Sequence, residues 1–282
     1  MLRRATMLSI LVLLAVIAPG VVATTGSREI VTYHARLPEA RKNPAATVDS
    51  FKKGPADNQE RMVLFMLVMT LGQADLIPPR EYRHLVDRGL LDVYDQIRGH
   101  AVHYLDETYK DEELQEVYRR CTFDKSLLVR YNAAEQMRNY PSPESVAYLD
   151  GLLDDDSIEV RDRAAGTLCS WYGSDSVPGI RDIFLRNVES KDIRRAGVAA
   201  RVLATVFDMP PRPDILNAYL DAELKKSPPQ FGGNNVRAII RLLGRISDPT
   251  SKSVLEKATQ YPNRYVAADA KEALSKTTAR SQ

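Results

Sequence analysis

Two stretches decide the fold of this 282-residue chain: VRYNAAEQMRNYPSPESVAYL (residues 129–149) and VRDRAAGTLCSWYGSDSVPGI (residues 160–180). Both carry Val-Arg, an Ala pair, a Met or Leu, an aromatic residue and two further apolar residues at the same offsets. The second stretch starts 31 residues after the first. Self-similarity at a period of roughly 20–50 residues is typical of stacked supersecondary units, so the sequence predicts a repeat array.

The pattern continues towards the C-terminus in altered form. A third copy, shifted by one residue, comprises Arg195, Ala199, Ala200, Leu203, Val206 and Ile215. A fourth contains Val236, Arg237, residues 243–249 and Leu255, and residues 265–274 form a final half unit. In the first two copies the apolar residues at i, i+4, i+5, i+8 and i+11 lie on one stripe of a helix, and the small Ala pair lets neighbouring helices approach closely.

These residues resemble a known family. The phrase Asp-x-x-x-x-Val-Arg-x-x-Ala-Ala (residues 124–134 and 155–165) and the phrase Leu-Gly-Arg-Ile-Ser-Asp-Pro (residues 243–249) are similar to HEAT repeats, particularly the short type of phycobilisome lyases. The resemblance covers residues 124–276 and implies an all-α fold, an α-solenoid of stacked helical hairpins.

In HEAT proteins an acid six residues before the arginine resembles part of a ladder of polar contacts between repeats. The matching residues here are Asp124, Arg130, Asp155, Arg161, Glu189 and Arg195. Such arginines can bridge stacked helices, and a structural role for them is expected. The fourth copy has Phe231 where the acid would stand.

Residues 1–23 read as a secretory signal peptide. Arg3 and Arg4 precede the apolar run MLSILVLLAVIA (residues 7–18), and Pro19-Gly20 and a small residue at Ala23 follow. The run is shorter than the ~20 residues that span a bilayer, which disfavours an uncleaved anchor. We therefore expect export to the periplasm or the extracellular space, with no membrane span left after cleavage.

The remaining chain is expected to fall into four parts. Residues 24–56, rich in Pro, Gly and charge, read as a flexible leader or linker. Residues 57–123 read as a helical region, either degenerate repeats or an N-terminal cap, with a buried helix at residues 61–71. The HEAT-like array spans residues 124–276, and residues 277–282 read as a disordered tail.

The charge balance excludes one class of partner. Removal of the predicted signal peptide takes away Arg3 and Arg4 and no acid, so the basic residues fall from 39 to 37 and equal the 37 acidic residues. A nucleic-acid-binding protein would carry a clustered basic surplus, so no nucleic acid is expected as a partner.

The sequence carries no motif for catalysis and no cofactor is expected. It lacks a Gly-rich phosphate loop, a Gly-x-Ser-x-Gly elbow and a His-Glu-x-x-His helix. His100, His103 and Glu107 can share one helical face, which is compatible with a divalent-metal site; the alternative is a solvated or partly packed helix face. Cys121 and Cys169 either pair in an oxidising compartment or are buried separately.

These features favour a non-catalytic protein-interaction scaffold that binds a protein or peptide partner through its concave helical face. In HEAT-like arrays the second helix of each repeat, here the Val-Arg helix, lines that face. Helical spacing turns these residues away from the core stripe: Tyr131, Glu135, Arg138, Asp162, Arg201, Arg241 and Arg245. Phe231, in a Pro/Gly-rich loop, is a further candidate anchor or part of a long joint. The alternatives are a structural spacer in an envelope assembly and a lyase-like enzyme or enzyme accessory.

Overall fold

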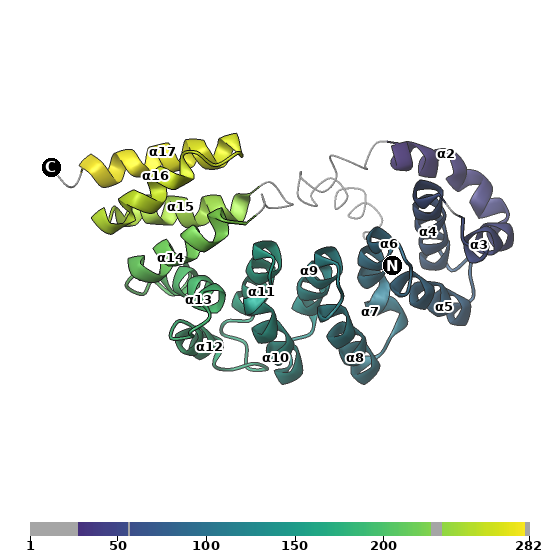
Figure 1. The fold of residues 1–282 in the computed structure, drawn as a ribbon. Coiled ribbons are helices and arrows are strands. Elements are labelled where there is room, and N and C mark those ends of the chain that lie inside the picture. Colours follow the sequence, from purple (N-terminus) through teal and green to yellow (C-terminus); the bar gives the residue numbers. More distant parts are fainter. Residues whose placement is uncertain (1–27, 56, 227–232, 280–282) are drawn as a thin grey trace. The chain divides into compact units, whose positions relative to one another are not determined.

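The computed structural model describes residues 28–55, 57–226 and 233–279, which fall into two compact units, Met1–Leu114 and Gln115–Gln282. The described residues form helices joined by turns and contain no strand (Figure 1). The all-α solenoid predicted from the repeats is thus confirmed. Within these residues, every helix is too short or too polar to cross a membrane. The predicted signal peptide and Phe231 lie outside the described residues.

Unit 1 packs around one apolar helix. Its helices are α2 (Arg28–Lys42), α3 (Pro44–Lys53), α4 (Asn58–Gln73), α5 (Pro79–Leu90), α6 (Asp95–Ala101) and α7 (Leu105–Thr108), with the 3₁₀ turn η2 (Val102–Tyr104) between the last two. Helix α4 contacts α2, α3, α5 and α6. It is buried nearly all round, as its apolar composition predicts.

The structure differs from the flexible linker expected over residues 24–56, because residues 28–53 form α2 and α3. Asn43 caps α3 by accepting a hydrogen bond from the amide of Ala46, and Pro44 occupies the first helical turn. Proline is favourable there, since that amide has no helical partner in any case. Phe51 is buried against Phe65 of α4, with ring centroids 5.8 Å apart. Tertiary packing therefore makes this segment part of the core.

Unit 2 is built from helical pairs. The first helices are α8 (Asp111–Thr122, which begins in unit 1), α10 (Pro143–Gly151), α12 (Ile180–Asn187), α14 (Pro213–Leu224) and α16 (Lys252–Ala258). The second helices are α9 (Leu127–Gln136), α11 (Ile158–Ser170), α13 (Ile193–Thr205), α15 (Asn234–Ile246) and α17 (Arg264–Ala279). Short 3₁₀ turns, η3 (Met137–Asn139), η4 (Leu152–Asp154) and η5 (Pro249–Ser251), extend three of these helices.

Two pairs of neighbouring second helices lie side by side, α9 with α11 and α15 with α17 (Figure 1). The Ala pairs of α9 and α11 are buried where the helices pack. Thr167 donates a hydrogen bond to the carbonyl of Ala134 at 2.7 Å, and the indole Nε1 of Trp171 donates to the carbonyl of Arg138 at 2.9 Å. At the end of the chain, α17 includes residues 277–279 and buries Thr277, so this part of the expected disordered tail is helical.

The third repeat shows what its one-residue shift means. Counted from the capping residues Asp192 and Ser157, the Ala pairs of α13 and α11 fall at the same positions. Arg195 therefore stands one residue early, and Ala196 occupies the buried position that Arg161 fills in α11. Val206, expected in the core stripe, is 51% exposed.

Candidate partner-binding surface

An arginine fork joins the first two repeats of the array. Arg130 of α9 donates from Nε and Nη2 to the two carboxylate oxygens of Asp155, 2.6 and 2.9 Å away, at the start of α11. Its Nη1 donates to the carbonyl oxygen of Asp124 at 2.8 Å. Two parallel charge-assisted hydrogen bonds fix both orientation and distance, so this contact braces one repeat against the next.

Arg161 occupies the equivalent position in α11 but reaches a different partner. Its side chain is fully buried, and Nη2 lies 2.6 Å from Oε1 of Glu223 in α14, at ion-pair distance though without hydrogen-bond alignment. Its Nε donates to the hydroxyl of Tyr219 at 3.2 Å, and Nη1 donates to the carbonyls of Asp155 and Asp156. A buried charge is tolerated when it is paired and hydrogen-bonded in this way.

A close approach of α13 and α14 makes this reach across the array possible. Gly197 of α13 lies against the ring of Tyr219, and a Cβ at that position would overlap the ring. Sequence reasoning missed Glu223 and Tyr219, although a signal exists: Glu223 completes an apolar i, i+3, i+4, i+7 stripe with Leu216, Tyr219 and Leu220. An acid in such a stripe indicates a buried, paired charge.

The structure does not bring Glu189 and Arg195 together. Glu189 is exposed and pairs with Arg212 at 3.2 Å. Arg195 instead reaches back to the preceding repeat, where its Nε lies 2.9 Å from Asp154. One residue turns a side chain by about 100° around a helix, so the shift of Arg195 redirects its guanidinium. Each of the three acids at residues 154–156 forms an ion pair with a different arginine, so the negative charge of this segment is neutralised.

Four of the predicted partner-facing residues take part in polar contacts between α9, α11 and α13. Arg163 of α11 donates to Glu135 of α9 at 3.1 Å and to the hydroxyl of Tyr131, whose ring lies 4.5 Å from the guanidinium carbon. Arg201 of α13 donates to Asp162 of α11 at 2.6 Å. These contacts tie α9, α11 and α13 together. The side chains of Arg201 and Asp162 are only 17% and 14% exposed, so the structure does not place these two on an open face as helical spacing predicts.

The remaining predicted residues that the structure describes are exposed to solvent. Arg138 follows α9 and is exposed. Arg241 and Arg245 lie on α15, both exposed. The Nε of Arg241 lies 2.9 Å from Asp269 of α17, which also binds Arg237 at 2.7 Å. Burial alone would raise the pKa of Asp269, but hydrogen bonds from these two arginines outweigh burial and lower it.

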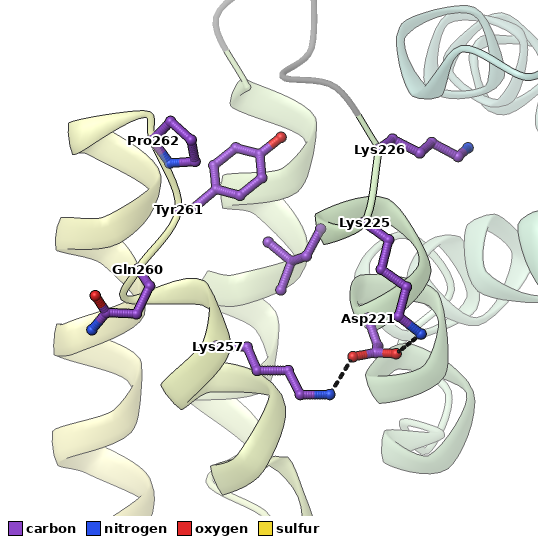
Figure 2. Close-up of a pocket in the computed structure, with 8 residues that line it drawn as sticks. Asp221, Lys225, Lys226, Lys257, Gln260, Tyr261 and Pro262 are labelled. Atoms are coloured by element: carbon purple, nitrogen blue, oxygen red, sulfur yellow. Dashed lines mark hydrogen bonds and ion pairs between the residues drawn. The ribbon is translucent and has the colours of Figure 1, made fainter.

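A cavity of about 390 Å³ lies at the C-terminal ends of α14 and α16 (Figure 2). Asp221 stands between Lys225 and Lys257, whose Nζ atoms are each 2.6 Å from a carboxylate oxygen, and these hydrogen bonds lower the pKa of Asp221. Leu224, Tyr261 and Pro262 give the apolar part of the lining. Lysines at helix C-termini also complement the helix dipole, so the cluster has a structural role of its own.

The histidine and cysteine candidates lie in largely buried surroundings. His100 and His103 lie with ring centroids 6.3 Å apart, and burial lowers the pKa of each to about 4. Glu107 instead accepts hydrogen bonds from Gln73 and Tyr82. No cluster of metal-ligating side chains occurs among the described residues.

Cys121 and Cys169 are both free thiols, and burial raises their pKa values to about 12 and about 11.

Comparison with known proteins supports the repeat assignment. Residues 89–169 match the family model for HEAT repeats. No curated protein matches the chain. Among solved structures, a crystal structure of an engineered protein is similar over 85% of this chain and 71% of its own, at 16% identity and a TM-score of 0.38. The X-ray structure of YibA from Escherichia coli is similar over 89% of this chain and 97% of its own, at 18% identity and a TM-score of 0.35.

Proposed function

We propose, from the HEAT repeats matched at residues 89–169, that this chain is a non-catalytic scaffold that binds a protein partner on the second helices of unit 2. One observation carries the proposal: Arg163 and Arg201 tie α9, α11 and α13 together through side-chain contacts, of which the Arg163–Glu135 pair is partly exposed. A surface whose side chains are already held in place loses less conformational entropy when a partner binds.

The composition of this surface suits a polar interface. It alternates guanidinium and carboxylate groups and includes the ring of Tyr131, half-buried beneath Arg163. Arg and Tyr are enriched among the residues that contribute most to protein interfaces. Alternating charges contribute more to the selection and alignment of a partner than to the affinity for it. Such a surface suits a scaffold that binds one specific partner.

Export is part of the proposal. Residues 1–23 carry the basic, apolar and small-residue segments of a secretory signal, so the partner is sought in the periplasm or the extracellular space. Mass spectrometry of the protein recovered outside the cytoplasm should show a new N-terminus after Ala23. Recovery of only the full-length chain from the cytoplasm would contradict export.

Site-specific photo-crosslinking tests the binding surface. The probes stand on second helices at Gly166, Arg245 and Ala268, and the matched controls on first helices at Glu144, Arg186 and Ala218; all six positions are exposed. Gly166 is well suited, because a Cβ added there meets no atom within 4 Å. In the envelope or medium of the exporting cell, we expect one protein to crosslink from the second-helix positions and not from the controls. Crosslinks confined to the first helices would refute the proposal.

A further inference from the structure

Helix α15, the fourth of the second helices, carries a stripe of arginines. Arg237, Arg241 and Arg245 recur every four residues and therefore lie along one face of the helix. The opposite face is buried in the core through Val236, Ile240 and Leu243. Exposure rises along the stripe, from a 22% exposed side chain at Arg237 to 60% at Arg241, and Arg245 is also exposed.

The stripe carries more positive charge than its neighbours neutralise. Asp269 of α17 is shared between Arg237 and Arg241. Arg264 lies beside the stripe, on Tyr265, with its guanidinium carbon 4.7 Å from the ring centroid; the guanidinium of Arg237 also faces this ring at 5.5 Å. Among the described residues, neither Arg245 nor Arg264 forms an ion pair. We call Arg237, Arg241, Arg245, Arg264 and Tyr265 the arginine face.

We propose that the arginine face binds an acidic, extended segment of the protein partner, an inference that rests on the proposed function. Residues four apart on a helix are separated by about 6 Å along its axis. In an extended chain, side chains on one side recur every ~6.6 Å. Acids at alternate positions of an extended segment thus meet successive arginines of the stripe, each as a charge-assisted pair.

Tyr265 favours a peptide as the occupant. Its ring is 51% exposed and flanked by two guanidinium groups, so it offers apolar contact for the segment between its acids. The chain as a whole has nearly balanced charge, unlike proteins that bind nucleic acid through a broad basic surface. The surplus of positive charge lies on the arginine face, which is large enough to pair with a few carboxylates.

Fluorescence anisotropy of the full mature chain tests the proposal with labelled peptides of about nine residues. One peptide alternates Glu and Ser, and the second has the same composition with its Glu residues in one block. We expect the alternating peptide to bind more tightly, with affinity that falls as salt rises. In the variant Arg241→Glu/Arg245→Glu, affinity should fall about 10- to 100-fold.

The matched control is Arg181→Glu/Arg186→Glu on α12, which makes the same change in charge at exposed positions of a first helix. Equal weakening by both variants would overturn the proposal, since only net charge would then matter. Tighter binding of single-stranded oligothymidylate or of anionic phosphatidylglycerol vesicles than of the alternating peptide would overturn it as well. Circular dichroism checks that both variants keep their helicity.

The crosslinking and anisotropy results separate the two proposals. If the partner crosslinks from Gly166 and Ala268 but still binds Arg241→Glu/Arg245→Glu, the second-helix surface stands and the acidic segment is wrong. If no partner crosslinks from the second helices while the alternating peptide binds with the expected spacing dependence, binding of acidic peptides by the arginine face stands, and the assignment of that peptide to a scaffold partner fails with the proposed function.

Discussion

Arg161 shows at the scale of one residue how a repeat motif can acquire a new role. Its counterpart Arg130 pairs with Asp155, the acid at the matching position of the next repeat, and both side chains are partly buried. Arg161 is instead sealed in the core between Tyr219 and Glu223. The motif predicts the position of both arginines, but the partner of Arg161 stands some sixty residues away in α14, at a position that the repeat motif does not include.

Replacing Glu223 with Leu should destabilise unit 2 by about 3–5 kcal/mol, because it leaves the guanidinium of Arg161 buried without its carboxylate. Removing both charges in Arg161→Met/Glu223→Leu should recover most of that loss. Urea unfolding measures both free energies. As a control, Lys226→Met removes a half-exposed lysine that also binds Glu223 and should cost less than about 1 kcal/mol. A single Glu223→Leu variant as stable as the parent would show that the pair contributes little.

At the scale of elements, the apolar stripes of the first two copies predict helices that the structure has as α9 and α11. Ser126, Ser157 and Asp192 cap α9, α11 and α13, each ahead of its Ala pair. Pro38, Pro44 and Gly54 make residues 28–53 read as a linker in the sequence. In the structure Pro38 lies inside α2, Pro44 lies in the first turn of α3, and Gly54 ends α3 in the left-handed region at φ 68°. Proline and glycine at helix ends support a helix, and local composition does not distinguish the two cases.

The ladder gives a prediction at the element scale. Asp155→Ala should destabilise the α9–α11 pair by about 1.5–3 kcal/mol, since it removes a buried acceptor of two hydrogen bonds from Arg130. Glu189→Ala removes the acid that the sequence places in the same ladder, yet its side chain is 72% exposed, and it should cost about 0.5 kcal/mol or less. Thermal unfolding by circular dichroism measures both. Equal losses would mean that the sequence ladder, and not the observed contacts, determines stability.

At the scale of the whole molecule, the two units differ in their titratable groups. All four histidines of the chain, His34, His84, His100 and His103, precede residue 115 and so belong to unit 1. The candidate surface of unit 2 relies instead on arginines and carboxylates, which keep their charges near neutral pH. The sequence predicted that surface as a set of helix positions. Which of its charges are paired could not be predicted, because pairing depends on the packing of α13, α14 and α15.

Mild acid should therefore loosen unit 1 before unit 2. Burial lowers the pKa of both His100 and His103 to about 4, from an ordinary value near 6.5. The nearby His103 lowers the pKa of His100 further. Between pH 6.5 and pH 4 the unfolded state binds more protons than the folded state, so stability falls as pH falls, by on the order of 1–3 kcal/mol. Above pH 6.5 both states are neutral and the effect vanishes.

Hydrogen exchange, corrected for the intrinsic effect of pH, measures this in each unit of the same sample. Peptides from α6 should lose protection between pH 6.5 and pH 5 while peptides from α11 keep it. The variant His103→Gln should reduce the loss in α6. A uniform loss in both units would point to carboxylates rather than to the buried histidines.

Trp171 is the one tryptophan of the chain, and its indole donates a hydrogen bond across the joint between two repeats, to the carbonyl of Arg138. Its ring is buried at that joint. The tryptophan fluorescence of the protein therefore originates at this single joint. A red shift of that emission reports water entering between those repeats, whatever happens in the rest of the chain.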